Sequence, residues 1–175
     1  MKGLTIKVDR LKELAQSINE LTGKAVLVGI PASEKDRDDD GPIDNANLGY
    51  LHETGSPANN IPARPFLVPG IEENAVAIER RLKRAAEVAM AKRGNVEAAL
   101  EKVGMTAQAG VRRKITSGPF EPLSNATLRA RARRGRKGAQ EELDRRARGE
   151  EPGAESAKPL IDTGQLRNAI NYVIR

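Results

Sequence analysis

The chain has 175 residues, of which 38% are apolar, 31% are charged and 2% are aromatic, and its formal net charge is +6; this allows one domain with a modest hydrophobic core. Because cysteine is absent, a disulfide framework, a cysteine-ligated metal and a thiol nucleophile are excluded. No apolar run approaches the ~20 residues of a membrane span, and the first residues lack the apolar segment of a signal peptide. We therefore expect no membrane association and a protein that is made and used in the cytoplasm, or leaves the cell by lysis.

The first elements in chain order predict a small sheet and an amphipathic helix. Residues 4–8 alternate between apolar and polar side chains, which indicates a short strand. Asp9 is a suitable N-cap for a helix that extends to about Thr22. One face of this helix is apolar and consists of Leu11, Leu14, Ile18 and Leu21. Residues 24–30 are rich in β-branched and apolar side chains and predict a buried strand.

An acidic loop at residues 31–44 resembles the first half of a calcium-binding EF-hand loop. The matching positions are held by Asp36, Asp38, Asp40 and Gly41. The twelfth position of an EF-hand loop carries a glutamate that closes the calcium shell, and here that position is Asn47. We therefore predict a solvated acidic loop, with no metal and no other cofactor.

The segment from Asn45 to Ile71 combines a helical turn with a stiff, proline-rich arm. Its rigidity comes from Gly55, Pro57, Pro62 and Pro65, because proline fixes its own φ and favours an extended residue before it. Residues 63–68 are predicted to be extended and to end at Pro69 and Gly70. Such an arm is suited to holding a fixed shape for a partner.

A long helical hairpin is predicted after the arm. Residues 71–93 carry one apolar stripe and are predicted to form a helix that Gly94 stops. Asn95 is then the N-cap of a second helix, whose stripe runs from Val96 to Ile115. Alanines in the two stripes allow the helices to approach closely. The hairpin is either plain core or, because apolar residues are scarce elsewhere, also a subunit contact.

The net charge is concentrated in residues 126–149, which contain nine Lys or Arg and three Asp or Glu, so the rest of the chain is neutral. Ser124 is predicted to cap a helix that carries a basic cluster, formed by Arg129, Arg131, Arg133, Arg134, Arg136 and Lys137. No aromatic residues for base stacking lie among them, so any contact with DNA would be to phosphates without sequence readout. The alternatives to DNA contact are that the basic cluster binds an acidic partner, or that it is a flexible segment with no partner. Residues 149–158, which follow it, are typical of a linker.

The last residues predict a short helical turn and a returning strand. Asp162 or Thr163 can cap the turn, and residues 169–174 alternate as a strand that returns to the sheet. The predicted fold is α+β, with a small antiparallel sheet packed against a long helical hairpin, a stiff proline-rich loop and a basic insert. Residues 1–125 and 159–175 form the single domain, and residues 126–158 form the insert, which is partly flexible.

Residues for catalysis are not evident in the sequence. His52 is the only histidine, so a histidine-based metal cluster is excluded, and no motif marks a serine partner for a catalytic triad. A phosphate-binding loop, a dinucleotide fingerprint and a zinc-protease motif are also absent. We predict an oligomeric interaction module and not an enzyme.

Two stretches of the chain carry a family resemblance. The first is LHETG at residues 51–55 followed by IPARPFL at residues 61–67. The second is FEPLS at residues 120–124 with Thr127, followed by PLIDTGQL at residues 159–166 and Ile170. Together these stretches, which cover about half of the chain, resemble in order the signatures of tail-completion or head–tail joining proteins of long-tailed bacteriophages, also called virion morphogenesis proteins. The basic insert between Thr127 and Pro159 is longer than the family pattern.

The resemblance implies a structural virion protein that forms a ring at the phage neck, through which DNA passes. A hexamer is expected rather than a dodecamer, with the tail terminator, tail tube and head–tail adaptor as partners. The protein would be assembled in the bacterial cytoplasm and located in the neck or tail of the virion. On this interpretation, subunit or partner contacts are expected at Tyr50, His52, Glu53, Arg64, Pro65 and Phe66. The basic cluster would contact DNA or an acidic partner.

Two alternatives come from other classes of protein. The first is a nucleic-acid-binding module that uses the basic cluster at residues 129–137. The second is an accessory protein of a hydrolase, with the acidic loop binding a metal.

Overall fold

The computed structural model describes residues 11–34, 36–37, 43–91 and 95–175. The strand predicted at residues 4–8, the helix stop at Gly94 and most of the EF-hand-like positions lie outside these ranges. The helices are α1 (Leu11–Thr22), α2 (Asn45–Thr54), α3 (Leu67–Glu72), α4 (Ala75–Ala91), α5 (Val96–Ser117), α6 (Asn125–Arg133), α7 (Lys137–Ala147) and α8 (Gln165–Ala169). Two short 3-10 turns, η1 (Ala32–Glu34) and η2 (Pro57–Asn59), and two strands, β1 (Val26–Gly29) and β2 (Asn171–Ile174), complete the described elements.

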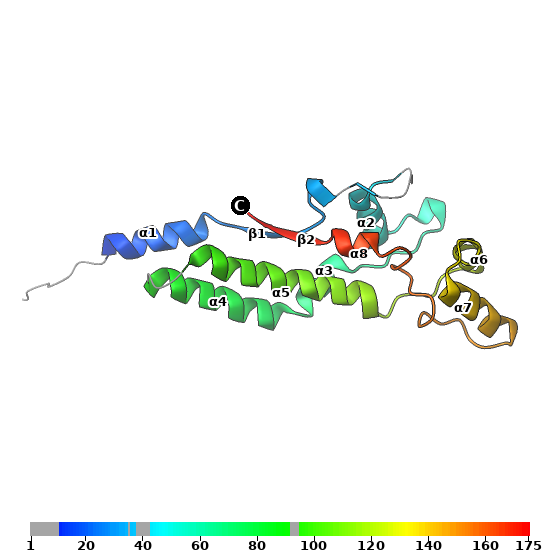
Figure 1. Ribbon diagram of the computed structural model, residues 1–175. Helices are drawn as coiled ribbons and strands as arrows, with labels where there is room; N and C mark the ends of the chain where they lie inside the picture. The colour runs from blue at the N-terminus through cyan, green and yellow to red at the C-terminus, as the bar shows by residue number, and fades with distance from the viewer. Residues whose placement is uncertain (1–10, 35, 38–42, 92–94) are drawn as a thin grey trace, which may run out of the picture.

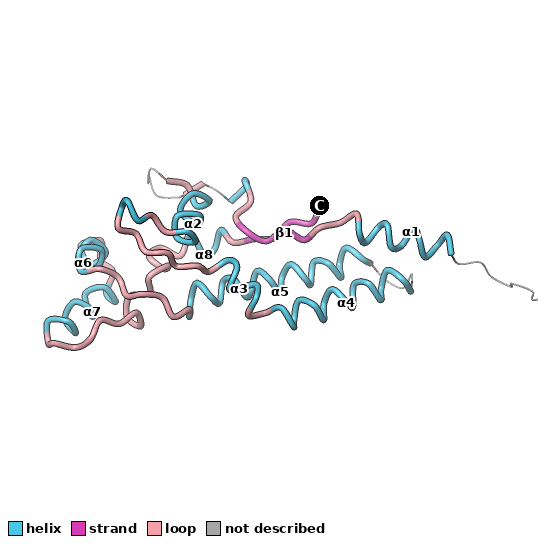
Figure 2. The backbone as a smooth tube through the Cα atoms, turned by 180° about the vertical axis from the view of Figure 1, so that it is seen from behind, coloured by secondary structure: helices cyan, strands magenta, loops and turns pink. Residues whose placement is uncertain are grey.

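The molecule is elongated, with α1 at one end and α6 and α7 at the other (Figures 1 and 2). Helices α4 and α5 lie side by side along the middle, and both strands contact α5. Strands β1 and β2 pair antiparallel, with Val26 opposite Ile174 and Gly29 opposite Asn171. The predicted α+β class, with a small antiparallel sheet packed against long helices, is confirmed.

Helix α5 begins where the sequence predicts. The side-chain oxygen of Asn95 accepts a hydrogen bond from the backbone N–H of Ala98 at 3.2 Å, which satisfies a free donor of the first turn. The predicted stripe of this helix is buried from Leu100 to Ile115. A methyl group at Gly104 would collide with the ring of Tyr172, so glycine at this position allows the sheet to lie directly on the helix.

The prediction of one continuous helix over residues 71–93 is wrong in its first part. Helix α3 already begins at Leu67, so Pro69 and Gly70 lie inside a helix and do not end a strand. Pro69 is tolerated because it lies in the first turn, where its missing N–H has no acceptor within the helix. The helical conformation is interrupted between α3 and α4. There, the side-chain amide of Asn74 donates a hydrogen bond to the carbonyl of Gly70 at 2.8 Å. This bond satisfies one of the free carbonyls at the end of α3.

The C-terminal strand is confirmed as β2, but the turn before it differs from the prediction. The N-cap of α8 is Gly164, with a φ of 86°, and neither Asp162 nor Thr163 is the cap. Glycine adopts this left-handed conformation without steric cost. The carboxylate of Asp162 is therefore available for long-range contacts.

Two hydrophobic clusters stabilise the two halves of the molecule. The larger cluster contains Phe66, Val111, Ile115, Leu160, Leu166 and Ile170. The smaller cluster contains Leu123, Leu128, Ala139 and Ala157 and holds α6 against α7. Residues 149–158, expected to be a linker, pack on this hairpin, because the N–H of Gly153 donates to Glu142 at 2.7 Å. The basic insert is thus a helical hairpin with a small core of its own.

Helix α1 is confirmed as a helix, but its apolar stripe is not in the core. Leu11, Leu14 and Ile18 are 74%, 39% and 44% exposed. The helix contacts α4, and its one buried residue is the small Ser17. The apolar face that the sequence pattern predicted therefore meets solvent in a single copy of the chain.

Candidate interaction surfaces

The proline-rich arm is fixed by a carboxylate from α2. One oxygen of Glu53, Oε2, accepts hydrogen bonds from the backbone N–H groups of Phe66 and Leu67 at 2.7 and 2.9 Å, and Oε1 accepts one from Val68 at 3.1 Å. Phe66, the N-cap of α3, makes no capping hydrogen bond through its own side chain. Glu53, which belongs to α2, therefore caps α3. Its negative charge also interacts favourably with the positive N-terminal end of the α3 dipole.

Arg64 and Phe66, both expected at a partner contact, are used inside the chain. Phe66 is 2% exposed and belongs to the larger core. Arg64 is 6% exposed, and its Nε and Nη2 donate to the backbone oxygen of Glu121 at 3.4 and 3.3 Å. Burial lowers the pKa of Arg64, and the charge of Glu121 partly offsets this effect. These bonds join the two stretches that carry the family resemblance.

Of the other residues expected at contacts, two are accessible. Tyr50 is 70% exposed on α2, and Pro65 is exposed between the buried Arg64 and Phe66. His52 is partly buried and lines a cleft. Tyr50 on α2 and Pro65 on the arm are therefore the two of these residues that a partner can reach.

The basic cluster divides into two sets, and the first set surrounds Asp162. Arg131 donates to the backbone oxygens of Lys158, Pro159 and Ile161, each at 2.8 Å. Arg134 and Arg136 donate to the carboxylate of Asp162 at 2.6 and 3.0 Å. Partial burial raises the pKa of Asp162, but the hydrogen bond from Arg134 and the charge of Arg131 outweigh this effect and hold it below its usual value.

In the sequence, Asp162 is a candidate cap and a member of the PLIDTGQL stretch, and nothing there marks it as an ion-pair partner. The partner Arg134 lies 28 residues away, and no local pattern links the two side chains. Asp162 can be identified as the counter-ion of Arg134 only from the tertiary structure, which places α6 beside residues 159–162.

The second set of basic residues faces solvent. Arg129, Arg133 and Lys137 are exposed, and none of them has an ion pair with the part of the chain that the structure describes. Arg129 and Arg133 are four positions apart on α6, so they share one face of that helix. This face is the part of the predicted basic cluster that is free to bind phosphate.

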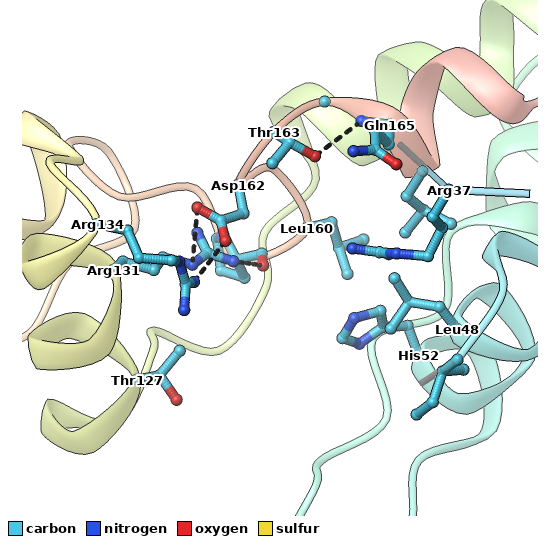
Figure 3. Close-up of a pocket in the computed structure, with 14 residues that line it drawn as sticks. Arg37, Leu48, His52, Thr127, Arg131, Arg134, Leu160, Asp162, Thr163 and Gln165 are labelled. Atoms are coloured by element: carbon cyan, nitrogen blue, oxygen red, sulfur yellow. Dashed lines mark hydrogen bonds and ion pairs between the residues drawn. The ribbon is translucent and has the colours of Figure 1, made fainter. Parts of the chain in front are cut away.

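A cleft of about 320 Å³ separates α2 from α6 and from residues 159–166. Figure 3 shows His52 and Leu48 on α2 on one side of it, and Arg131 and Arg134 on the other. Desolvation, followed by the charges of Arg64 and Arg131, lowers the pKa of His52 to about 4. The imidazole is therefore neutral at neutral pH, and the cleft is positively charged through its arginines.

An apolar groove of about 630 Å³ lies on the other half of the molecule. Its lining comes from α1, β1, α3, α4 and α5. The apolar lining residues are Leu21, Val26, Val28, Ile71, Ile78, Leu82, Ala86, Leu100, Val103 and Ala107. The groove continues the exposed stripe of α1, because Leu21 belongs to both. On α4, Val76 and Leu82 are also 70% and 44% exposed.

The described residues hold no group of three or more His, Asp or Glu side chains placed to bind a metal ion. In the same ranges, no helix combines the length and the apolar composition that crossing a membrane requires.

Comparison of the chain with protein-family models, with curated proteins and with solved structures finds no match.

Proposed function

We propose that this chain is a structural protein of the head–tail junction of a long-tailed bacteriophage, assembled from several copies into a ring through which DNA passes. The family resemblance of residues 51–67 and 120–170 supports this class of protein. These two stretches pack against each other, because Phe66, Leu160 and Leu166 share one core and Arg64 binds the backbone of Glu121. The residues of the resemblance thus form one framework.

The observation that carries the oligomeric role is the uncovered apolar surface of α1, α4 and α5. Three large side chains of α1 are exposed beside an open groove whose lining is mostly apolar. A contiguous exposed apolar surface is typical of a protein–protein contact. A contact between unlike faces of identical copies gives a ring when the rotation between them closes.

We expect the double variant Leu14→Glu, Ile18→Glu to weaken self-association by more than about 100-fold, because two buried aliphatic contacts are lost and two charges face an apolar surface. The wild-type chain should sediment as an oligomer and show rings in electron micrographs. Gln16 and Asn19 are exposed positions outside the apolar stripe, so Gln16→Glu, Asn19→Glu adds the same charge and should leave association unchanged. A wild-type chain that is monomeric at all accessible concentrations would contradict the proposal.

A second candidate function, nucleic-acid binding, is favoured by the exposed basic face of α6 that Arg129 and Arg133 share. Replacing Arg129 and Arg133 by glutamine should weaken duplex DNA binding and reduce the slope of log K against log salt by about 2. The exposed Arg80 and Arg81 of α4, replaced in the same way, are the matched control. An unchanged slope in the Arg129, Arg133 variant would exclude this face as the DNA contact.

A further inference from the structure

Among the described residues, the side chains that line the cleft between α2 and residues 159–166 carry more positive than negative charge. Arg131 and Arg134 line the cleft and lie within ion-pair distance of Asp162, which leaves a formal surplus of one positive charge among these three side chains. Arg37 lines the same cleft. Guanidinium groups bind carboxylates and phosphates through paired hydrogen bonds, so the surplus is suited to a second oxyanion.

Polar groups of the cleft remain available to a ligand. The side chain of Arg134 is 56% exposed, and Asp162 engages only one of its terminal nitrogens, Nη2. The Nδ1 atom of His52 is buried and has no hydrogen-bond partner among the described residues. A buried polar atom without a partner destabilises the free protein, and a bound group that forms a hydrogen bond to this atom would remove that cost.

The shape of the cleft favours a protein side chain over duplex DNA. Leu48, Leu160 and Leu166 form its apolar wall, which suits the methylene groups of an acidic side chain. Arg131 is recessed, with its side chain 11% exposed, whereas the phosphates of a duplex lie on a convex surface. The open face of Arg129 and Arg133 is the one that such a surface can reach.

We propose that this cleft binds the carboxylate of a glutamate or aspartate side chain presented by a partner protein, with a neighbouring apolar side chain of the partner against Leu48 and Leu160. Arg134 donates to the carboxylate, and His52 supplies the ring nitrogen for a hydrogen bond to the bound segment. This inference goes beyond the proposed function, because it defines the chemistry that one partner must present. It does not require a ring, so its test is independent of the self-association experiment.

The test uses His52 as a reporter, since it is the only histidine of the chain. The probe is the peptide acetyl-Ala-Glu-Leu-Glu-Ala-amide, and the matched control is acetyl-Ala-Gln-Leu-Gln-Ala-amide. We expect the imidazole resonances of the full-length protein to shift in a saturable way with the glutamate peptide only. The pKa of His52, about 4 in the free protein, should rise in the complex, because a bound carboxylate offsets the charges of Arg64 and Arg131 that lower it. Arg37, Arg134 and Asp162 line the same cleft.

Two variants link the signal to the cleft. Arg134→Gln should weaken binding of the glutamate peptide about tenfold, and Arg129→Gln, outside the cleft, should leave it unchanged. Asp162→Asn removes the competing carboxylate and should tighten binding. Equal shifts with both peptides, or no shift with either, would overturn the inference. A response to inorganic phosphate or a duplex oligonucleotide without one to the glutamate peptide would also overturn it and make the cleft a phosphate site.

Discussion

Replacing Glu142 by alanine is expected to destabilise the α6–α7 hairpin by about 3 to 5 kcal/mol, the usual cost of removing one partner of a buried ion pair. Glu142 is 0% exposed. Its carboxylate accepts hydrogen bonds from Arg145 at 2.8 Å, from Arg146 at 2.9 Å and from the backbone N–H of Gly153 at 2.7 Å. The variant leaves the largely buried guanidinium of Arg146 without its carboxylate and releases the segment around Gly153.

Urea unfolding and amide hydrogen exchange in α6 and α7 measure this effect. Glu141→Ala is the matched control, because Glu141 is the preceding residue of the same helix and is exposed. Its effect should stay within about 0.5 kcal/mol. Equal stabilities of the two variants would show that the buried carboxylate does not hold the hairpin together.

The same carboxylate makes the hairpin sensitive to acid. Burial alone raises the pKa of Glu142, but the hydrogen bonds from Gly153 and Arg146 outweigh it, so the folded-state pKa lies below the value of 4.5 in the unfolded chain. A lowered pKa stabilises the fold above the unfolded value, and this contribution is lost as the pH falls through the folded one. The stability difference between the wild type and Glu142→Ala should therefore shrink below pH 4.5.

Replacing Glu53 by alanine is expected to lower the free energy of unfolding by about 3 kcal/mol, because three backbone N–H groups lose a charged acceptor at once. These groups belong to Phe66, Leu67 and Val68. Phe66 also lies in the larger core, so movement of this backbone disturbs the packing there. Thermal and urea unfolding of the wild type and of Glu53→Ala measure this loss of stability.

Glu101 provides the control for Glu53. It lies on α5 and is exposed, so Glu101→Ala should change stability by less than about 0.5 kcal/mol. Glu53→Gln keeps one acceptor oxygen and should fall between the wild type and Glu53→Ala. If Glu53→Ala unfolds like the Glu101 control, the carboxylate is not the cap of α3.

Two residues of the first family-resemblance stretch have structural roles inside the chain. Glu53 and Arg64 lie in a stretch that the sequence assigns to partner contacts, yet both form hydrogen bonds within the chain. The surfaces accessible to partners include Tyr50 on α2 with Pro65 on the arm, the apolar groove beside α1, the arginine-lined cleft, and the α6 face of Arg129 and Arg133.

The sequence by itself determined the elements whose signals are local. Asn95 and Ser124 cap helices as expected because a capping side chain bonds an N–H three residues away. The stripe of α5 and the alternation in β2 are likewise periodic patterns within one element. The α+β class followed from these local signals.

Only the tertiary structure decided which contacts those elements make. Capping of α3 by Glu53 spans 13 to 15 residues, and the pairing of Arg134 with Asp162 spans 28; neither leaves a local pattern. The stripe of α1 shows a further limit, because periodicity identifies an apolar face but not whether the same chain covers it. Local sequence fixes backbone conformation over a few residues, whereas burial and charge pairing depend on distant segments.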